Sequence, residues 1–131
     1  MLQLGSSREA ELTVSVDLAT ERVRLRLSLD GEVAESPFNH HLEGAIPVVE
    51  SLPGESVKLR CCFNCSMSDY FHGGTGLSGM FCFRDSREAY GSVRSKDDYV
   101  RLVPDAITEY VDELYVCRQF EHREPGTGYR G

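Results

Sequence analysis

Apolar and polar side chains alternate along the N-terminal third of the chain. Two such stretches lie within residues 11–29, and a short polar segment at 19–22 separates them. Alternation with a period of two is typical of half-buried antiparallel strands. We therefore expect a β-hairpin over 11–29 that sets Asp17 opposite Arg24 on the solvent face.

The pattern then changes from strand alternation to helical spacing. Asp30-Gly31 is a strong hairpin-turn signal and predicts a short third strand near Val33. Apolar residues next recur every three to four positions, at Leu42, Ala45, Ile46, Val49 and Leu52. We expect a short helix here with Pro47 in its first turn, because proline lacks the N–H group that later turns need. The Pro-Gly pair that follows should end this helix.

Further elements are expected in the second half of the chain. Alternation indicates strands over 57–60, 80–84, 90–94 and 113–118, the last of which also fits a helix. Ser95 followed three residues later by Asp98 resembles a capping box and predicts a short helix that ends at Pro104.

Together these elements predict an α+β fold, with a mainly antiparallel β-sheet and one or two short helices. The length of 131 residues is typical of one domain. We expect a single domain over 1–131, made of the hairpin, a cysteine-rich loop at 61–82 and a tail at 121–131. The sequence shows no membrane span and no signal peptide, so we expect a cytoplasmic protein.

The cysteines provide the strongest chemical signal. There are five, and three of them lie between positions 61 and 65. In a reducing compartment, grouped cysteines more often bind metal or react than form disulfides. The Cys-x-x-Cys pair Cys62 and Cys65 offers two thiolates from one turn, and Cys82 and Cys117 could supply two more. We expect these four residues to hold a structural Zn²⁺ ion in a zinc-knuckle-like loop.

Three alternatives remain open for these thiols. They could be buried side chains without metal, Cys62 and Cys65 could form a redox pair, or the group could hold an iron–sulfur cluster. Strand alternation directs Cys61 away from its neighbour, so we expect it in the core. His72 or His122 could replace one thiolate as a ligand.

Other motifs form no persuasive catalytic set. Gly74 to Gly79 matches the dinucleotide fingerprint, but a strand rather than a helix is expected to follow it. We expect these glycines to let the loop fold closely over the metal site. Asp69 could act as a general acid or support a metal ligand, although turn chemistry also explains it. Four thiolates would leave no position on the metal for water, which disfavours Lewis-acid chemistry.

The charge distribution disfavours one class of partner. The formal net charge is −7, and residues 1–57 hold ten Asp and Glu against four Arg. An acidic chain is poorly suited to wrap a phosphate backbone, so we expect no nucleic-acid partner. The acidic excess forms no block of like charges and is interpreted as a solvated surface.

Several short motifs together resemble a family of small, uncharacterised bacterial proteins. The shared pattern is Cys-x-x-Cys, Ser-Asp-Tyr, a Gly-rich loop, Cys-Phe-Arg and a closing Gly-Tyr-Arg-Gly, and it covers about residues 42–131. It is found here at 62–65, 68–70, 74–79, 82–84 and 128–131, with Cys117 before the end. The resemblance implies a bacterial cytosolic setting and one group formed by the four cysteines, but no activity or substrate.

We interpret the chain as a zinc-binding, non-catalytic module that binds another protein, of an immunity or regulatory type. Two other functions are retained. One is a thiol-redox or metal-dependent enzyme centred on Cys62, Cys65 and Asp69, and the other is a structural subunit of a larger assembly. The sequence predicts no membrane partner and leaves the oligomeric state open. Arg123 could pack back onto the sheet, or residues 126–131 could extend into a partner.

Overall fold

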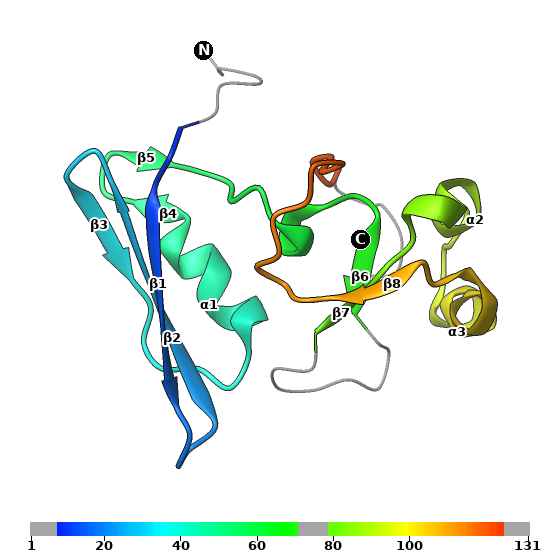
Figure 1. Ribbon diagram of the computed structural model, residues 1–131, viewed down its shortest axis with the longest axis horizontal. Coiled ribbons are helices and arrows are strands. Elements are labelled where there is room, and N and C mark those ends of the chain that lie inside the picture. Colours follow the sequence, from blue (N-terminus) through cyan, green and yellow to red (C-terminus); the bar gives the residue numbers. More distant parts are fainter. Residues whose placement is uncertain (1–7, 71–78, 125–131) are drawn as a thin grey trace. The chain divides into compact units, whose positions relative to one another are not determined.

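The chain separates into two compact units. The computed structural model describes residues 8–70 and 79–124, and its units are Met1–Val57 and Lys58–Gly131. Antiparallel sheets and short helices make up both units (Figure 1), which confirms the predicted α+β class. Each unit has its own buried residues, and the single-domain organisation stays a prediction.

The elements of the first unit are β1 (Glu11–Asp17), β2 (Arg22–Leu29), β3 (Glu32–Glu35), α1 (Leu42–Val49), β4 (Ser51–Leu52) and β5 (Glu55–Ser56). Those of the second unit are η1 (Cys62–Asn64), β6 (Ser68–Tyr70), β7 (Met80–Cys82), η2 (Arg84–Ser86), α2 (Arg87–Gly91), α3 (Lys96–Ala106) and β8 (Glu109–Val111). The strand orders are β1-β2-β3, β4-β5 and β6-β7-β8, and neighbouring strands are antiparallel. None of the described helices is both long and apolar enough to cross a membrane.

The predicted N-terminal hairpin forms, but its register differs by two residues. Asp17 lies opposite Arg22 instead of Arg24. The Asp17 carboxylate accepts hydrogen bonds from the backbone N–H groups of Ala19 and Thr20, at 3.0 and 3.4 Å. This Asx-type turn places the loop one residue earlier than expected. A slip of two residues leaves every side chain on its predicted face.

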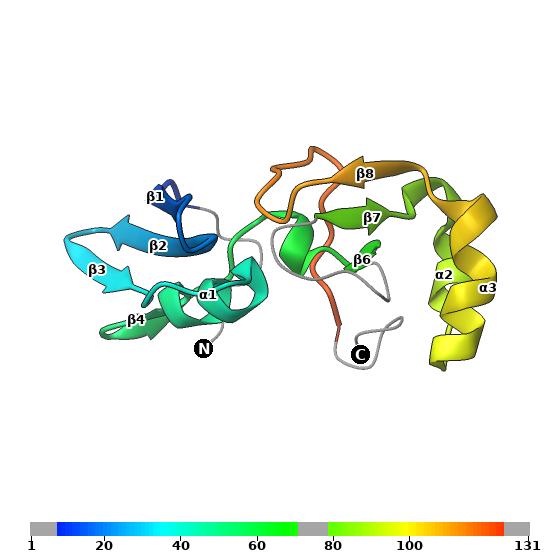
Figure 2. The same ribbon diagram turned by 90° about the horizontal axis from the view of Figure 1, so that it is seen from below.

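The core of the first unit lies between β2 and α1. Four alternating residues of β2 are buried, Val23, Leu25, Leu27 and Leu29. They face the buried side of α1, which consists of Leu42, Ala45, Ile46 and Val49. Figure 2 shows α1 against β2 and β3, with β1 on the far side of β2. The predicted turn before β3 is confirmed, because Asp30 and Gly31 both have positive φ, 50° and 82°.

Helix α1 begins earlier than predicted. It starts at Leu42, so Pro47 lies inside the helix rather than in its first turn. A proline this near the end of an eight-residue helix removes few backbone bonds, and the buried face maintains the helix by packing. Leu52 is not helical and belongs to β4. Gly54, with φ of 91°, forms the turn between β4 and β5.

In the second unit an aromatic core joins the sheet to two helices. Its buried members are Phe81, Phe83, Tyr90, Val93, Tyr99 and Val103. The ring of Phe83 stacks on that of Tyr90, with ring centroids 4.8 Å apart. Strand β7 forms over Met80–Cys82, so the strand predicted for 80–84 is shorter than expected and Arg84 begins η2. Tyr90 reaches the core from α2 and not from a strand. The aromatic contact therefore outweighs the β propensity of 90–94.

Two other predicted strands are wrong. Residues 57–60 and 113–118 are irregular, and the last strand of the sheet is β8, which pairs with β7 at Glu109–Val111. The predicted cap of α3 is confirmed, because the N–H of Asp98 donates to Ser95 Oγ at 3.1 Å. The helix nevertheless continues past position 104 to Ala106.

Candidate metal centre

The Cys-x-x-Cys segment forms a tight turn near the start of the second unit. Cys62 begins the one-turn helix η1 rather than ending a strand, and the N–H of Cys65 donates to the Cys62 carbonyl at 3.1 Å. The side-chain amide of Asn64 donates to the Leu59 carbonyl at 2.7 Å and fixes the incoming chain. Both cysteines are buried.

A segment from much later in the chain lies against this turn. The N–H of Cys62 donates to the Tyr115 carbonyl at 3.0 Å, and the N–H of Ser66 donates to the Glu121 carbonyl at 2.7 Å. Cys117 lies between these two anchor points in the sequence. The fourth cysteine is therefore brought to the turn by irregular backbone hydrogen bonds, because 113–118 is not the expected strand.

The β-sheet positions the remaining cysteine. Cys82 ends β7 and lies opposite Ser68 of β6, three residues after Cys65. The N–H of Phe83 donates to the Met67 carbonyl at 2.8 Å and extends this pairing. Cys82 is buried, as are Cys62 and Cys65.

The thiols interact electrostatically with one another. Burial raises the pKa of Cys62 to about 12, and the hydroxyl of Ser68 acts in the opposite direction. The charges of Cys65, Cys82 and Cys117 raise this pKa further. Because such interactions weaken with distance, the structure brings the four sequence-predicted cysteines into one neighbourhood.

The four thiols do not form a closed ligand shell. Across residues 8–70 and 79–124, no three or more His, Cys, Asp or Glu side chains are grouped tightly enough to hold a metal ion. Metal ligation requires the thiolate form, which the raised pKa of Cys62 and of Cys82 disfavours in the absence of a cation. The zinc site therefore stays a prediction that the donor chemistry fits.

The guanidinium group of Arg84 lies beside the Cys82 thiol. Nη1 of Arg84 is 3.7 Å from Cys82 Sγ and donates to Glu109 Oε1 at 2.6 Å. Burial raises the pKa of Cys82, and Arg84 lowers it. A fixed guanidinium would offset part of the negative charge that four thiolates concentrate. Arg84 was not among the predicted site residues, although its position two residues after a proposed ligand is a usable signal.

Cys117 differs from the other three cysteines in being partly exposed. The N–H of Gln119 donates to Cys117 Sγ at 3.3 Å, and the N–H of Phe120 donates to the Cys117 carbonyl at 3.2 Å. No cysteine forms a disulfide in the described ranges, which hold all five, and Cys61 is buried in front of η1.

The histidines are placed differently from the cysteines. His122 forms an antiparallel backbone bridge with Cys65, but its side chain is exposed. Its ring packs edge-on against Phe120, with centroids 4.7 Å apart. His72 and the glycines at 74–78 lie outside the described residues.

Asp69 is fully buried on β6 and does not form a turn. The Tyr90 hydroxyl donates to Asp69 Oδ2 at 2.5 Å, and Arg123 Nη2 lies 3.5 Å from the same oxygen. Arg123 also donates to the Tyr90 oxygen and to the Ser68 carbonyl, each at 3.0 Å. Burial raises the pKa of Tyr90, and the Asp69 charge adds to this effect. These contacts join β6, α2 and the segment after Cys117, and they give Asp69 a structural environment.

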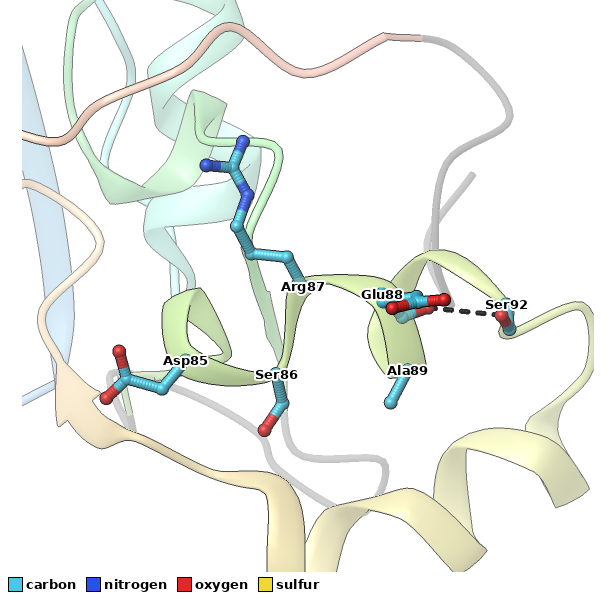
Figure 3. Close-up of a pocket in the computed structure, with 6 residues that line it drawn as sticks. All are labelled: Asp85, Ser86, Arg87, Glu88, Ala89 and Ser92. Atoms are coloured by element: carbon cyan, nitrogen blue, oxygen red, sulfur yellow. Dashed lines mark hydrogen bonds between the residues drawn. The ribbon is translucent and has the colours of Figure 1, made fainter.

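A shallow open depression lies where η2 meets α2 (Figure 3). It is lined by Asp85, Ser86, Arg87, Glu88, Ala89 and Ser92. The Arg87 side chain points away from those of Asp85 and Ser86, and Ser92 Oγ donates to the Glu88 carbonyl at 3.1 Å. Because these side chains do not converge, the depression does not rival the cysteine group as a candidate site.

Comparison with known proteins adds no relative to this description. No family model matches the chain, and neither a curated protein nor a solved structure matches it. The fold defines the chain as an α+β protein, in which Cys62 interacts electrostatically with Cys65, Cys82 and Cys117.

Proposed function

We propose that the chain is a zinc-binding module whose metal site is structural. The observation that supports this most is the electrostatic interaction of Cys62 with Cys65, Cys82 and Cys117, which come from three separate parts of the second unit. Four cysteine thiolates form the usual donor set of a structural zinc site.

The four cysteines would hold the ion, and the surrounding residues would support them. Arg84 would offset charge beside Cys82, and the hydrogen bond from the N–H of Gln119 would orient the Cys117 sulfur. Bound zinc supplies a cross-link between the η1 turn, the end of β7 and the segment around Cys117. Because an unfolded chain has no preformed site, binding would contribute directly to folding.

Thiol redox chemistry is a weaker proposal for these residues. A reactive cysteine needs a lowered pKa, because the thiolate is the nucleophile. Burial instead raises the pKa of Cys62 to about 12. Asp69, the acid of the alternative enzyme hypothesis, is buried and bonded to Tyr90. Both observations favour a binding role over catalysis.

The partner that we propose is another protein. Tyr110 and Val116 are 77 % and 72 % exposed, although large apolar and aromatic side chains are usually covered. Exposed tyrosines are typical of protein-binding surfaces. Val116 directly precedes Cys117, so zinc would order the segment that presents it, whereas β8 presents Tyr110. An immunity or regulatory module fits such a surface.

The metal proposal is tested by elemental analysis of protein purified without added metal. We expect about one zinc per chain, and loss of most of it in Cys82→Ser. The matched control is Cys61→Ser, which changes a buried neighbour that we do not place among the ligands and should retain zinc. A metal-free wild-type chain with four thiols open to alkylation would contradict the proposal.

The partner proposal is tested separately with Tyr110→Glu and Val116→Glu. These variants should keep zinc and lose a protein that the wild type retains from an extract of its host. Glu124→Gln, an exposed change in the same unit, is the control and should retain that protein. Identical retention by all three variants would contradict binding through this surface.

A further inference from the structure

The first unit contains a sheet edge that its own fold leaves open. Strand β2 is paired on both sides, with β1 along one side and with β3 and Asn39 along the other. Among the described residues, no strand pairs with the outer edge of β1. This edge offers a row of unpaired backbone groups over seven residues, which is a template for another strand.

The apolar face of β1 is also incompletely covered. Val14 and Val16 lie opposite Leu25 and Val23, which are buried. Val14 and Val16 are themselves 45 % and 51 % exposed, because α1 packs on β2 and β3. Leu18, just beyond the end of the strand, is 85 % exposed. The open edge therefore continues into an open apolar surface.

Strand β1 lacks the features that usually protect an edge. Residues 11–17 contain no proline, lysine or glycine, and their two charged residues, Glu11 and Asp17, lie at the ends. Natural proteins protect edges with such residues, with bulges or with a covering segment. Over the part of the chain that the structure describes, this long regular edge has neither a bulge nor a paired strand to protect it, so it can serve as a pairing surface.

We propose that this edge pairs with β1 of a second copy of the chain. The two strands would run antiparallel about a two-fold axis at Ser15 and would join two three-stranded sheets into one. This register sets Val14 opposite Val16 and Thr13 opposite Asp17. The apolar face of each copy would then extend that of the other.

Charge selects this register over the nearest alternative. An axis at Val14 would place Glu11 directly opposite Asp17, and like charges in that position repel. An axis at Ser15 instead gives Asp17 a threonine hydroxyl as its neighbour. The N-terminal unit carries a charge of −6, from ten acidic and four basic residues. Pairing should therefore strengthen as salt screens this repulsion.

Light scattering on the full-length, zinc-replete protein tests the proposal. We expect the mass to double as the concentration rises, with the transition shifting to lower concentration in higher salt. Val16→Lys should remove the dimer and halve the mass. Val33→Lys, on the opposite edge of the same sheet, is the matched control and should remain dimeric. A wild type that is monomeric throughout, or a dimer that Val16→Lys leaves intact, would overturn the proposal.

Cross-linking tests the register. With oxidised glutathione, Ser15→Cys should form disulfide-linked dimers, because the two sulfurs meet at the axis. Thr13→Cys should not, since equivalent residues would lie about 13 Å apart along the strands. The wild type measures any background from native cysteines. Cross-linking of Thr13→Cys but not of Ser15→Cys would overturn the register.

Discussion

Asp69 shows how a single buried charge is accommodated. Its carboxylate accepts a hydrogen bond from the Tyr90 hydroxyl, and the Arg123 guanidinium supplies the opposite charge beside it. A buried polar group is costly mainly when a partner is removed. The three residues therefore depend on one another.

Removing one hydroxyl from this network should destabilise the protein. We expect Tyr90→Phe to lower the free energy of unfolding by about 1–3 kcal/mol, because Asp69 loses its closest donor. Urea denaturation measures this change. Tyr110→Phe removes the same atom from an exposed ring and should have little effect. Equal effects of the two substitutions would show that the buried network adds no stability.

The turn after β1 provides a prediction about pH. Hydrogen bonds from the Thr20 side chain and backbone hold the pKa of Asp17 below its ordinary value. The associated stability is present above the ordinary pKa of 3.8 and is lost as the pH falls through the lowered value. Thr20→Val should raise the pKa of Asp17 toward 3.8, as measured by NMR titration of its carboxyl group. An unchanged pKa would contradict this account.

At the scale of elements, the helix caps differ in a way that can be measured. Ser95 caps α3 through a hydrogen bond from the Asp98 N–H, whereas Ser86 precedes α2 without such a bond. Ser95→Ala should therefore lower the free energy of unfolding by about 1 kcal/mol, and Ser86→Ala should change it much less. Thermal unfolding of both variants measures the difference. A larger loss in Ser86→Ala would contradict the assignment of the caps.

Local patterns predicted the elements that local forces determine. The N-terminal hairpin, the Asp30-Gly31 turn and the capped start of α3 follow from side-chain alternation and backbone chemistry within a few residues. The predicted register of the hairpin was wrong, because the Asx turn at Asp17 closes the loop one residue earlier than expected. Alternative positions of the turn differ by small free energies, which the alternation of apolar and polar residues does not reveal.

Local sequence patterns could not predict the contacts between segments that are distant in the sequence. Tyr90 is helical because its ring stacks on Phe83, which a strand pattern cannot indicate. Residues 113–118 bond irregularly to η1 and form no strand. The spacing of the four cysteines and the family resemblance predict a common metal site, and that site stays a prediction. The Arg84 contact and the buried environment of Asp69 depend on tertiary packing and were missed.

At the scale of the whole molecule, the division into two units makes the effect of metal local. All four proposed ligands belong to the unit Lys58–Gly131. After chelation of zinc, we expect amide hydrogen exchange to accelerate in that unit and to stay slow in β2. Cys82→Ser should reproduce this pattern without chelator. Loss of protection in both units together would show that they unfold as one cooperative body.

The segment 113–121, which accepts hydrogen bonds from residues 62–66, also has a consequence for folding during translation. The first unit is complete once Val57 has emerged from the ribosome, and its strands pair with near neighbours. The Cys-x-x-Cys turn must instead wait for partners such as Arg123, which lies 55 residues after Ser68. Until Cys117 has emerged, Cys62, Cys65 and Cys82 lack the fourth proposed ligand, and their thiols remain open to oxidation or to competing metals. The nascent chain is therefore most vulnerable between the folding of its first unit and the emergence of the segment that holds Cys117 and Arg123.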